Sequence, residues 1–168
     1  MSYKKLYWDN GNLRYEGEMK DGKYHGKGKE YHKTGGLKYE GEMKDGEYHG
    51  YGQLYYNVFS NQKHLQYEGE FKDGKYDGYG KEYYLLNNLH YKGEFKDGKK
   101  HGKGIEYFER GHIYIKHKGY FKDGKYQGKE PEGDDTKEAV LALTDYIKKT
   151  IDEIKEARPD LFSEEKST

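Results

Sequence analysis

Histidine and carboxylate side chains recur at regular intervals in this chain, and these residue types bind metals and transfer protons. One row of equivalent positions in a repeated stretch is occupied by His25, His49, Asp77, His101 and Gln127. Because a metal site needs a full set of ligands and partners that orient them, a row that includes Gln127 does not fit one. We therefore expect these residues to close hairpin loops, and we predict no metal site.

Regularly spaced carboxylates and a Gly-X-Gly motif raise the question of catalysis. Glu16 and Glu18 are two residues apart, as are Gly26 and Gly28, and both pairs have copies further along the chain. The glutamates fall on an open strand face with no cleft to enclose a substrate, and no helix N-terminus follows the glycines to bind a phosphate. The sequence predicts no catalytic residue and no cofactor, so we expect the protein not to be an enzyme.

All of these residues belong to a motif that occurs five times. It reads YEGEMKDGKYHGKG in the first copy, and the copies begin at Tyr15, Tyr39, Tyr67, Tyr91 and His117. A period of 24 to 28 residues indicates one supersecondary unit per repeat, stacked in a line. Residues 4–14 match the second half of a repeat. The sequence thus predicts an array over 1–129 that contains half a repeat and five copies, the last one truncated.

Each copy has the pattern of a β-hairpin. The Asp21-Gly22 pair and its copies are typical of a two-residue type I′ turn. Before the turn, tyrosine, glycine and methionine or phenylalanine alternate with charged residues, which predicts one aromatic face and one charged face. A two-residue turn sets a register in which Met19 faces Tyr24 and Gly17 faces Gly26.

The repeated glycines have a packing role in this interpretation. A glycine weakens a strand unless another group must approach the backbone there, and a tyrosine ring can lie flat over it. Rows of such rings would replace the aliphatic core that the chain lacks. We predict a mainly β fold, a single-layer antiparallel meander of stacked hairpins that is elongated and twisted.

The motif YEGE[MF]KDGKxHGxG, followed by EYY and a Gly-containing turn, closely resembles the MORN repeat (membrane occupation and recognition nexus). Its phrasing is similar to the bacterial variant, which includes small antitoxin-like proteins. The resemblance covers roughly residues 3–129. It implies stacked β-hairpins in a grooved sheet, and roles in scaffolding, protein–protein contact, homodimerisation or association with phosphoinositide membranes.

The chain departs from the pattern of this family in two places. The tryptophan common in the first strand is replaced by Met19, Met43, Phe71, Phe95 and Phe121. The last copy also ends at Lys129, before its second strand is complete. The first departure disfavours insertion into lipid, and the second leaves a sheet edge to be covered.

Charge and composition limit the partners. Lys and Arg together number 31, as do Asp and Glu, which speaks against nucleic acid and gives no support to an anionic membrane. The chain has no cysteine, and its start has no apolar run that resembles a signal peptide. We therefore expect a cytoplasmic protein with a protein partner, and homodimerisation is left open.

Residues after the array have a different composition. A linker over 130–135 precedes a predicted amphipathic helix over 136–158, which Pro159 ends, and a tail over 159–168. Its apolar stripe consists of Val140, Leu143, Ile147, Ile151 and Ile154. Two roles remain open for this stripe, a cap on the last repeats or a surface that binds a partner.

Positions that vary between otherwise identical repeats are the candidates for specificity. Tyr51 and Tyr79 interrupt a lysine pattern, and exposed aromatic residues are preferred anchors of protein interfaces. Further candidates follow the strands or lie in the longest loop: Trp8, Tyr56, Tyr84, Phe108, Val58 and Phe59. We predict a non-catalytic scaffold that binds a protein through the tyrosine-rich face and the C-terminal helix. The alternatives are a peripheral membrane module and, more weakly, a carbohydrate-binding surface.

Overall fold

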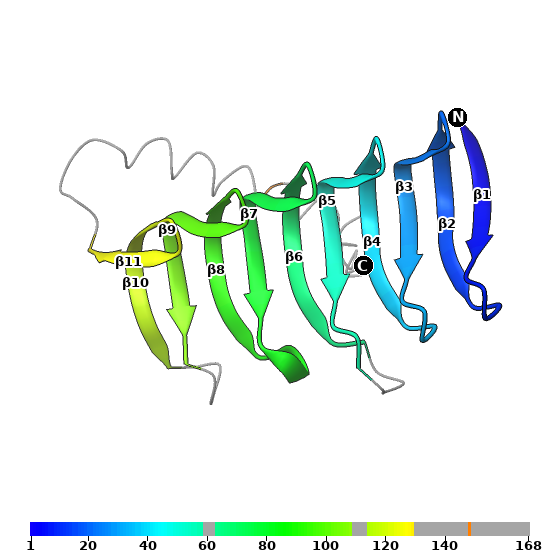
Figure 1. Ribbon diagram of the computed structural model, residues 1–168. Coiled ribbons are helices and arrows are strands. Elements are labelled where there is room, and N and C mark those ends of the chain that lie inside the picture. Colours follow the sequence, from blue (N-terminus) through cyan, green and yellow to red (C-terminus); the bar gives the residue numbers. More distant parts are fainter. Residues whose placement is uncertain (59–62, 109–113, 130–147, 149–168) are drawn as a thin grey trace, which may run out of the picture. The chain divides into compact units, whose positions relative to one another are not determined.

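The computed structural model describes residues 1–58, 63–108, 114–129 and Lys148. The chain divides into two units, Met1–Glu130 and Pro131–Thr168. In the first unit, eleven strands form one antiparallel sheet in which each strand pairs with the next in the chain (Figure 1). The predicted single-layer meander is confirmed. The predicted linker, helix and tail lie outside the described residues apart from Lys148, so the structure does not support the helix and it stays a prediction.

Ten strands form five hairpins after an N-terminal strand. The strands are β1 (Ser2–Tyr7), β2 (Leu13–Lys20), β3 (Lys23–Tyr31), β4 (Leu37–Lys44), β5 (Glu47–Tyr55), β6 (Leu65–Lys72), β7 (Lys75–Tyr83), β8 (Leu89–Lys96), β9 (Lys99–Tyr107), β10 (Ile115–Lys122) and β11 (Lys125–Gly128). A short 3₁₀ helix, η1 (Leu85–Asn87), connects β7 to β8.

The Asp-Gly turns have the predicted geometry. Asp21 and Gly22 have φ angles of 51° and 76°, both positive as a type I′ turn requires, and the four other Asp-Gly pairs share this feature. Neighbouring turns are joined, because the Gly46 N–H donates to the Tyr24 carbonyl at 2.9 Å, and equivalent bonds follow at each later turn. The turns therefore line up along one edge of the sheet, which we call the turn edge, and the connections between hairpins form the loop edge (Figure 1).

The pairing of β2 with β3 agrees with the predicted register only next to the turn. Met19 pairs with Tyr24, as predicted, but Gly17 pairs with Gly28 and not with Gly26. Between these two pairs β2 has one residue and β3 has three. The predicted register is therefore wrong beyond Met19, and β4–β5 and β6–β7 are shifted in the same way.

A β-bulge causes this shift. Gly26 has a φ of 58°, in the left-handed region that favours glycine, and the Glu18 carboxylate lies where a Cβ would point. Glu18 Oε1 also accepts a hydrogen bond from the Lys27 backbone N–H at 3.2 Å. In the first four copies the repeated Gly is followed by a glutamate, and this side chain has a structural role because it lies against the extra backbone of the bulge.

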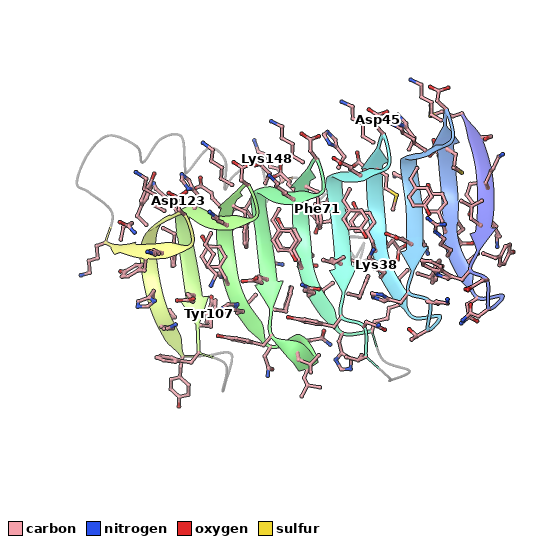
Figure 2. All side chains as sticks on the ribbon, viewed as in Figure 1. Lys38, Asp45, Phe71, Tyr107, Asp123 and Lys148 are labelled. Atoms are coloured by element: carbon pink, nitrogen blue, oxygen red, sulfur yellow. The ribbon has the colours of Figure 1, made fainter. Side chains whose placement is uncertain are left out.

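Two layers of rings form the core on one face of the sheet. The inner rings, Tyr15, Tyr39, Tyr67 and Tyr91, are fully buried against glycines of the neighbouring strand. Tyr24, Tyr48 and Tyr76 stack on the first three of them at 3.7–3.8 Å. Figure 2 shows the rings in a row between the turn edge, near Asp45, and the loop edge, near Tyr107. Tyrosine over glycine is therefore confirmed as the core, and we call this the tyrosine face.

The opposite face carries cross-strand pairs of charges. Lys5 Nζ lies 3.1 Å from Glu16, and Lys29 Nζ lies 2.9 Å from Glu40. These residues are half-buried or exposed, so each pair contributes little to stability. We call this side the charged face.

Candidate binding surface

A second bulge near the loop edge turns one additional side chain of each repeat onto the tyrosine face. Glu30 pairs with Tyr39 and Tyr31 pairs with Leu37, which leaves Lys38 without a cross-strand partner. The Lys38 ammonium consequently reaches Glu30 at 3.2 Å and lies 5.8 Å from the centre of the Tyr48 ring. Each repeat thus places three side chains together: one on a strand, one in the bulge and one in the outer ring layer.

We call these groups of three the triplets, each given in the order strand position, bulge position, outer-ring position. The five triplets are Leu6, Arg14, Tyr24; Glu30, Lys38, Tyr48; Leu54, Gln66, Tyr76; Glu82, His90, Lys100; and Glu106, Lys116, Tyr126. Their strand positions lie in one row, because each pairs with an inner tyrosine or with His117. The triplets follow each other along the sheet, so the differences between repeats accumulate on one surface.

The second triplet is a closed set of donors and acceptors. The Tyr48 hydroxyl donates to Glu30 Oε2 at 2.6 Å, and the Lys38 ammonium contacts Glu30 Oε1 at 3.2 Å. Burial raises the pKa of Tyr48 far above its usual range, and the hydrogen bond to the Glu30 carboxylate raises it further. Tyr48 therefore stays a neutral donor, and Glu30 is fully used inside the fold.

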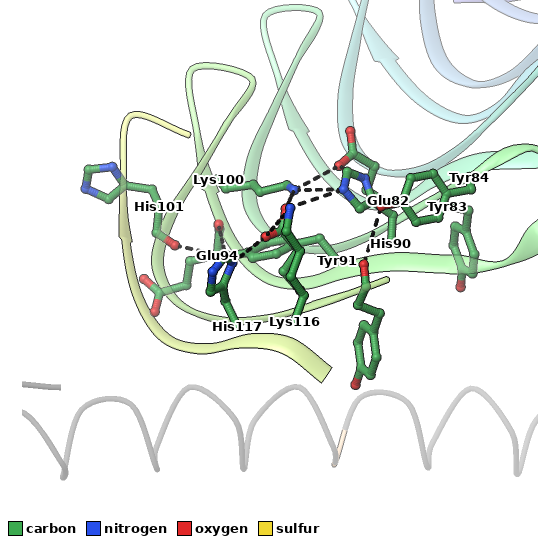
Figure 3. A network of polar contacts seen from close by, with 12 residues as sticks. Glu82, Tyr83, Tyr84, His90, Tyr91, Glu94, Lys100, His101, Lys116 and His117 are labelled. Carbon is green, nitrogen blue, oxygen red and sulfur yellow. Dashed lines mark hydrogen bonds and ion pairs between the residues drawn. The ribbon is translucent and has the colours of Figure 1, made fainter. Parts of the chain in front are cut away.

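The fourth and fifth triplets merge into one network, which Figure 3 shows from close by. The Lys100 ammonium lies 2.7 Å from Glu106 Oε1 and 3.1 Å from His90 Nε2. His90 Nδ1 contacts Glu82 Oε2 at 2.9 Å, and His117 Nδ1 contacts Glu106 Oε2 at 2.8 Å. Lys100 occupies the position of a stacked tyrosine and lies 5.1 Å from the centre of the Tyr91 ring.

Glu106 is the most tightly held acid of this network. Its side chain is buried, which by itself raises the pKa, but hydrogen bonds from Lys100 and His117 and the charge of Lys116 outweigh this and lower the pKa to about 2. The carboxylate is therefore ionised throughout the neutral and mildly acidic range. Such a group stabilises this end of the sheet and is not suited to act as a general base near pH 7.

Three of the predicted partner-binding aromatics join neighbouring repeats. The bonds run from Trp8 Nε1 to the Tyr31 carbonyl (3.2 Å), from the Tyr56 hydroxyl to the Tyr83 carbonyl (2.8 Å) and from the Tyr84 hydroxyl to the Tyr107 carbonyl (3.4 Å). Phe108, at the next equivalent position, is 52% exposed. Trp8, Tyr56 and Tyr84 therefore have a structural role, whether or not a partner also contacts them.

We expect Tyr56→Phe to lower the free energy of unfolding by about 1 kcal/mol, because it removes a half-buried hydrogen bond and leaves the Tyr83 carbonyl without this donor. Tyr7→Phe is the matched control, since Tyr7 is 60% exposed. Urea unfolding of both variants measures the difference. Equal stability of the two would show that the bond between repeats contributes nothing.

The remaining predicted site residues do not join this surface. Tyr51 and Tyr79 lie on the charged face, opposite Glu70 and Glu94 of the neighbouring strands. Val58 is half-buried at the loop edge. Phe59 and the helix residues Val140, Leu143, Ile147, Ile151 and Ile154 lie outside the described residues, so their predicted roles stay predictions.

The histidine row lies along the turn edge. His25 Nδ1 is 3.8 Å from Asp45 of the following turn, and His49 Nδ1 is 3.7 Å from Asp73. Among the described residues, no group of three or more His, Cys, Asp or Glu side chains has the arrangement of a metal site. In the same part of the chain, no helix has the length and apolar character needed to cross a membrane.

Sequence reasoning missed the triplets. Glu30, Glu82 and Glu106 follow Gly-Lys or Gly-Ile near the ends of second strands, where equivalent positions have leucine. This alternation of leucine and glutamate was a visible signal. It could not be interpreted without the bulges, which bring these glutamates next to Lys38, His90 and Lys116, each directly before the following inner tyrosine or its equivalent.

A comparison with protein-family models matches the MORN repeat at residues 15–37, 39–58, 67–84 and 91–113. These four segments together make up half of the chain. A search of curated proteins finds no match.

Proposed function

Because the chain belongs to the MORN repeat family, we propose that it is a non-catalytic scaffold that binds a protein partner through the tyrosine face. One observation carries this proposal. The residues that recur in every repeat are used by the fold, whereas the strand and bulge positions of the triplets differ between repeats and lie together on one face. A surface whose side chains differ from repeat to repeat, on a backbone that is the same in each repeat, is suited to recognise one particular partner.

The chemistry of the tyrosine face supports a protein as the partner. Rigid outer rings such as Tyr48 and Tyr76 alternate with Arg14, Lys38 and His90, and aromatic and arginine side chains dominate the energetics of protein interfaces. The frame beneath them is already ordered by stacking and hydrogen bonds, so binding costs little conformational entropy. The predicted apolar helix over 136–158 is proposed as a second segment that contacts the same partner.

We extend the proposal to a cytoplasmic inhibitor of the antitoxin type, on the resemblance of the repeats to the bacterial variant. Such an inhibitor would inactivate the bound protein by covering part of its surface, without a covalent reaction. The partner could also be a second copy of the chain, which light scattering would detect as self-association.

Affinity capture with the full chain as bait, in an extract of its own cells, tests the proposal. We expect an Arg14→Ser, Phe108→Ser variant of the tyrosine face to lose its protein partner, and a Tyr51→Ser, Tyr79→Ser variant of the charged face to retain it. The opposite result would move the interface to the charged face. A Leu143→Asp variant tests the predicted helix in the same way, and light scattering reports self-association.

A second candidate, an anionic lipid surface, is favoured by the turn edge. Lysines face each other across four turns, in the pairs Lys20–Lys23, Lys72–Lys75, Lys96–Lys99 and Lys122–Lys125. Residues 1–129 carry more basic than acidic side chains, and residues 130–168 carry more acidic than basic ones. The repeat array therefore has a positive net charge, although the net charge of the whole chain is zero. Co-sedimentation with phosphatidylserine vesicles at low salt tests this, and loss of binding in a Lys20→Ser, Lys72→Ser, Lys96→Ser, Lys122→Ser variant would support it.

A further inference from the structure

The first triplet breaks a pairing rule that the other four follow. Where the bulge position holds Lys38, His90 or Lys116, the strand position holds a glutamate, and where it holds neutral Gln66 the strand position is a leucine. The first triplet combines the cation Arg14 with Leu6. A cation is present there without the carboxylate that accompanies it in the other repeats.

The second triplet shows what these positions do when a carboxylate is present. Glu30 receives the Tyr48 hydroxyl at 2.6 Å and the Lys38 ammonium at 3.2 Å. Tyr24 and Arg14 occupy the positions equivalent to Tyr48 and Lys38, on the same bulge and with the same stacking on an inner tyrosine. The two donors of a carboxylate site are therefore in place in the first repeat.

Both donors lack an acidic acceptor in the part of the chain that the structure describes. The Tyr24 hydroxyl oxygen is buried, and its proton has no acceptor among the described residues. Burial raises the pKa of Tyr24, and the charge of nearby Arg14, together with a hydrogen bond that the guanidinium donates, partly opposes this. Arg14 is exposed, with its guanidinium carbon 5.0 Å from the centre of the Trp8 ring, and none of the ion pairs among the described residues includes it. A buried hydroxyl whose proton has no acceptor is costly, and a ligand that accepts this hydrogen bond recovers that cost.

We propose that Arg14, Tyr24 and Trp8 bind a carboxylate side chain, aspartate or glutamate, of the protein partner. This inference rests on the proposed function and adds the chemistry of one anchor residue. The Arg14 guanidinium offers two parallel N–H donors, which matches a carboxylate better than a single ammonium does. Trp8 holds the guanidinium by a cation–π contact and is itself fixed by its bond to the Tyr31 carbonyl.

Leucine at position 6 makes this site selective. Leu6 packs against the core and offers no acceptor, so neither Arg14 nor Tyr24 is paired with a carboxylate of its own triplet. Burial of the Tyr24 hydroxyl reduces competition from water and strengthens the charge-assisted hydrogen bond that it would donate. In the second triplet the equivalent donors, Tyr48 and Lys38, are already bound to Glu30, so that triplet offers no site to an external carboxylate.

Leu6→Glu tests the site by supplying the missing carboxylate within the chain. We expect the variant to raise the Tm by about 3 °C, because the introduced carboxylate would accept the Tyr24 hydroxyl and pair with Arg14. Leu54→Glu is the matched control, since its triplet has Gln66 in place of a cation, and it is expected to lower the Tm or leave it unchanged. Equal effects of the two substitutions would overturn the proposal.

Ligand binding is tested on the full chain with N-acetyl-glutamate amide as the probe and N-acetyl-glutamine amide as its neutral counterpart. We expect the glutamate probe alone, at millimolar concentrations, to shift the NMR signals of the Arg14 guanidinium and the Tyr24 ring. The shifts should disappear in Leu6→Glu and in Arg14→Gln. Equal shifts with the glutamine probe, or persistence of the shifts in Leu6→Glu, would overturn the proposal.

Two further arms separate the sources of failure. Binding of inorganic phosphate more than tenfold tighter than the glutamate probe would mean that the site takes phosphate and not a carboxylate, which also contradicts the proposal. If the probe binds but the tyrosine-face variant still captures its partner, the proposed interface fails while the carboxylate site stands. If capture depends on the face but the probe does not bind, only the anchor chemistry fails.

Discussion

Replacing Gly41 by alanine is expected to lower the free energy of unfolding by about 3 kcal/mol. A Cβ at this position would lie 2.5 Å from the Gly52 Cα and 2.6 Å from the Tyr39 hydroxyl oxygen. Both distances are far below van der Waals contact. The effect comes from this contact and not from backbone strain, since Gly41 is not among the glycines with a positive φ.

The surroundings of Gly41 have little freedom to move away. Gly52 is directly opposite in the sheet, so relief on that side would separate β4 from β5. On the other side, the Tyr39 hydroxyl donates to the Glu42 carbonyl at 2.7 Å, and the fully buried ring is stacked under Tyr48 at 3.8 Å. An added methyl group must therefore break either strand pairing or ring stacking.

Gly36→Ala is the matched control. Gly36 lies in the preceding loop, its φ is not positive, and a Cβ there would have no atom within 4 Å. We expect its stability to stay within about 0.5 kcal/mol of the wild type. Urea unfolding followed by circular dichroism measures both variants, and a Gly41→Ala protein as stable as the Gly36→Ala protein would contradict the ring-over-glycine core.

The parts of this fold that depend on neighbouring residues could be predicted from the sequence. Asp-Gly sets its own turn, and a tyrosine two residues from a glycine in a strand shares its face, so the turn, the meander and the aromatic core follow from local rules. The register beyond Met19 could not be predicted this way. It depends on Glu18, whose carboxylate bonds to the Lys27 N–H across the hairpin and stabilises an extra stretch of backbone.

The candidate site was harder to predict for the same reason. Trp8 and Tyr56 looked like free surface anchors because their partners, carbonyls of the next repeat, lie 23 and 27 residues away in the chain. Glu106 and Lys100 are six residues apart on one strand and drew no attention. Their side chains interact because the two bulges bring the triplets together on one face. No residue pattern within a single repeat predicts these bulges.

Glu106→Gln is expected to lower the free energy of unfolding by about 2 kcal/mol at pH 6. Removing one partner of a buried ion pair leaves the other charge uncompensated, and among the described acids Lys100 would retain only Glu82, at 3.9 Å. Solvent reduces the effect, because Lys116 and His117 on the other side of the carboxylate are partly exposed. Glu40→Gln on the charged face is the control, and its exposed pair should contribute less than about 0.5 kcal/mol.

The difference between wild type and Glu106→Gln should depend on pH in one direction. The pKa of Glu106 is lowered from 4.5 to about 2 by folding, so its ionised form stabilises the protein above pH 4.5, and this contribution is lost as the pH falls towards 2. Urea unfolding at pH 6 should therefore show the full difference in unfolding free energy between the wild type and Glu106→Gln. The difference should be smaller at pH 4 and smaller again at pH 3. A difference that stays constant with pH would assign the effect to shape and not to charge.

A double variant shows whether Lys100 is the partner that matters. Tyrosine at position 100 would stack on Tyr91 as Tyr48 stacks on Tyr39, so Lys100→Tyr restores the ring pattern and removes the cation that needs Glu106. In the Lys100→Tyr background, Glu106→Gln should cost about 1 kcal/mol less than in the wild type, because no buried ammonium is left unpaired. If Glu106→Gln lowers the free energy of unfolding equally in both backgrounds, Glu106 stabilises this end of the sheet through His117 and Lys116. The contact with Lys100 would then contribute nothing.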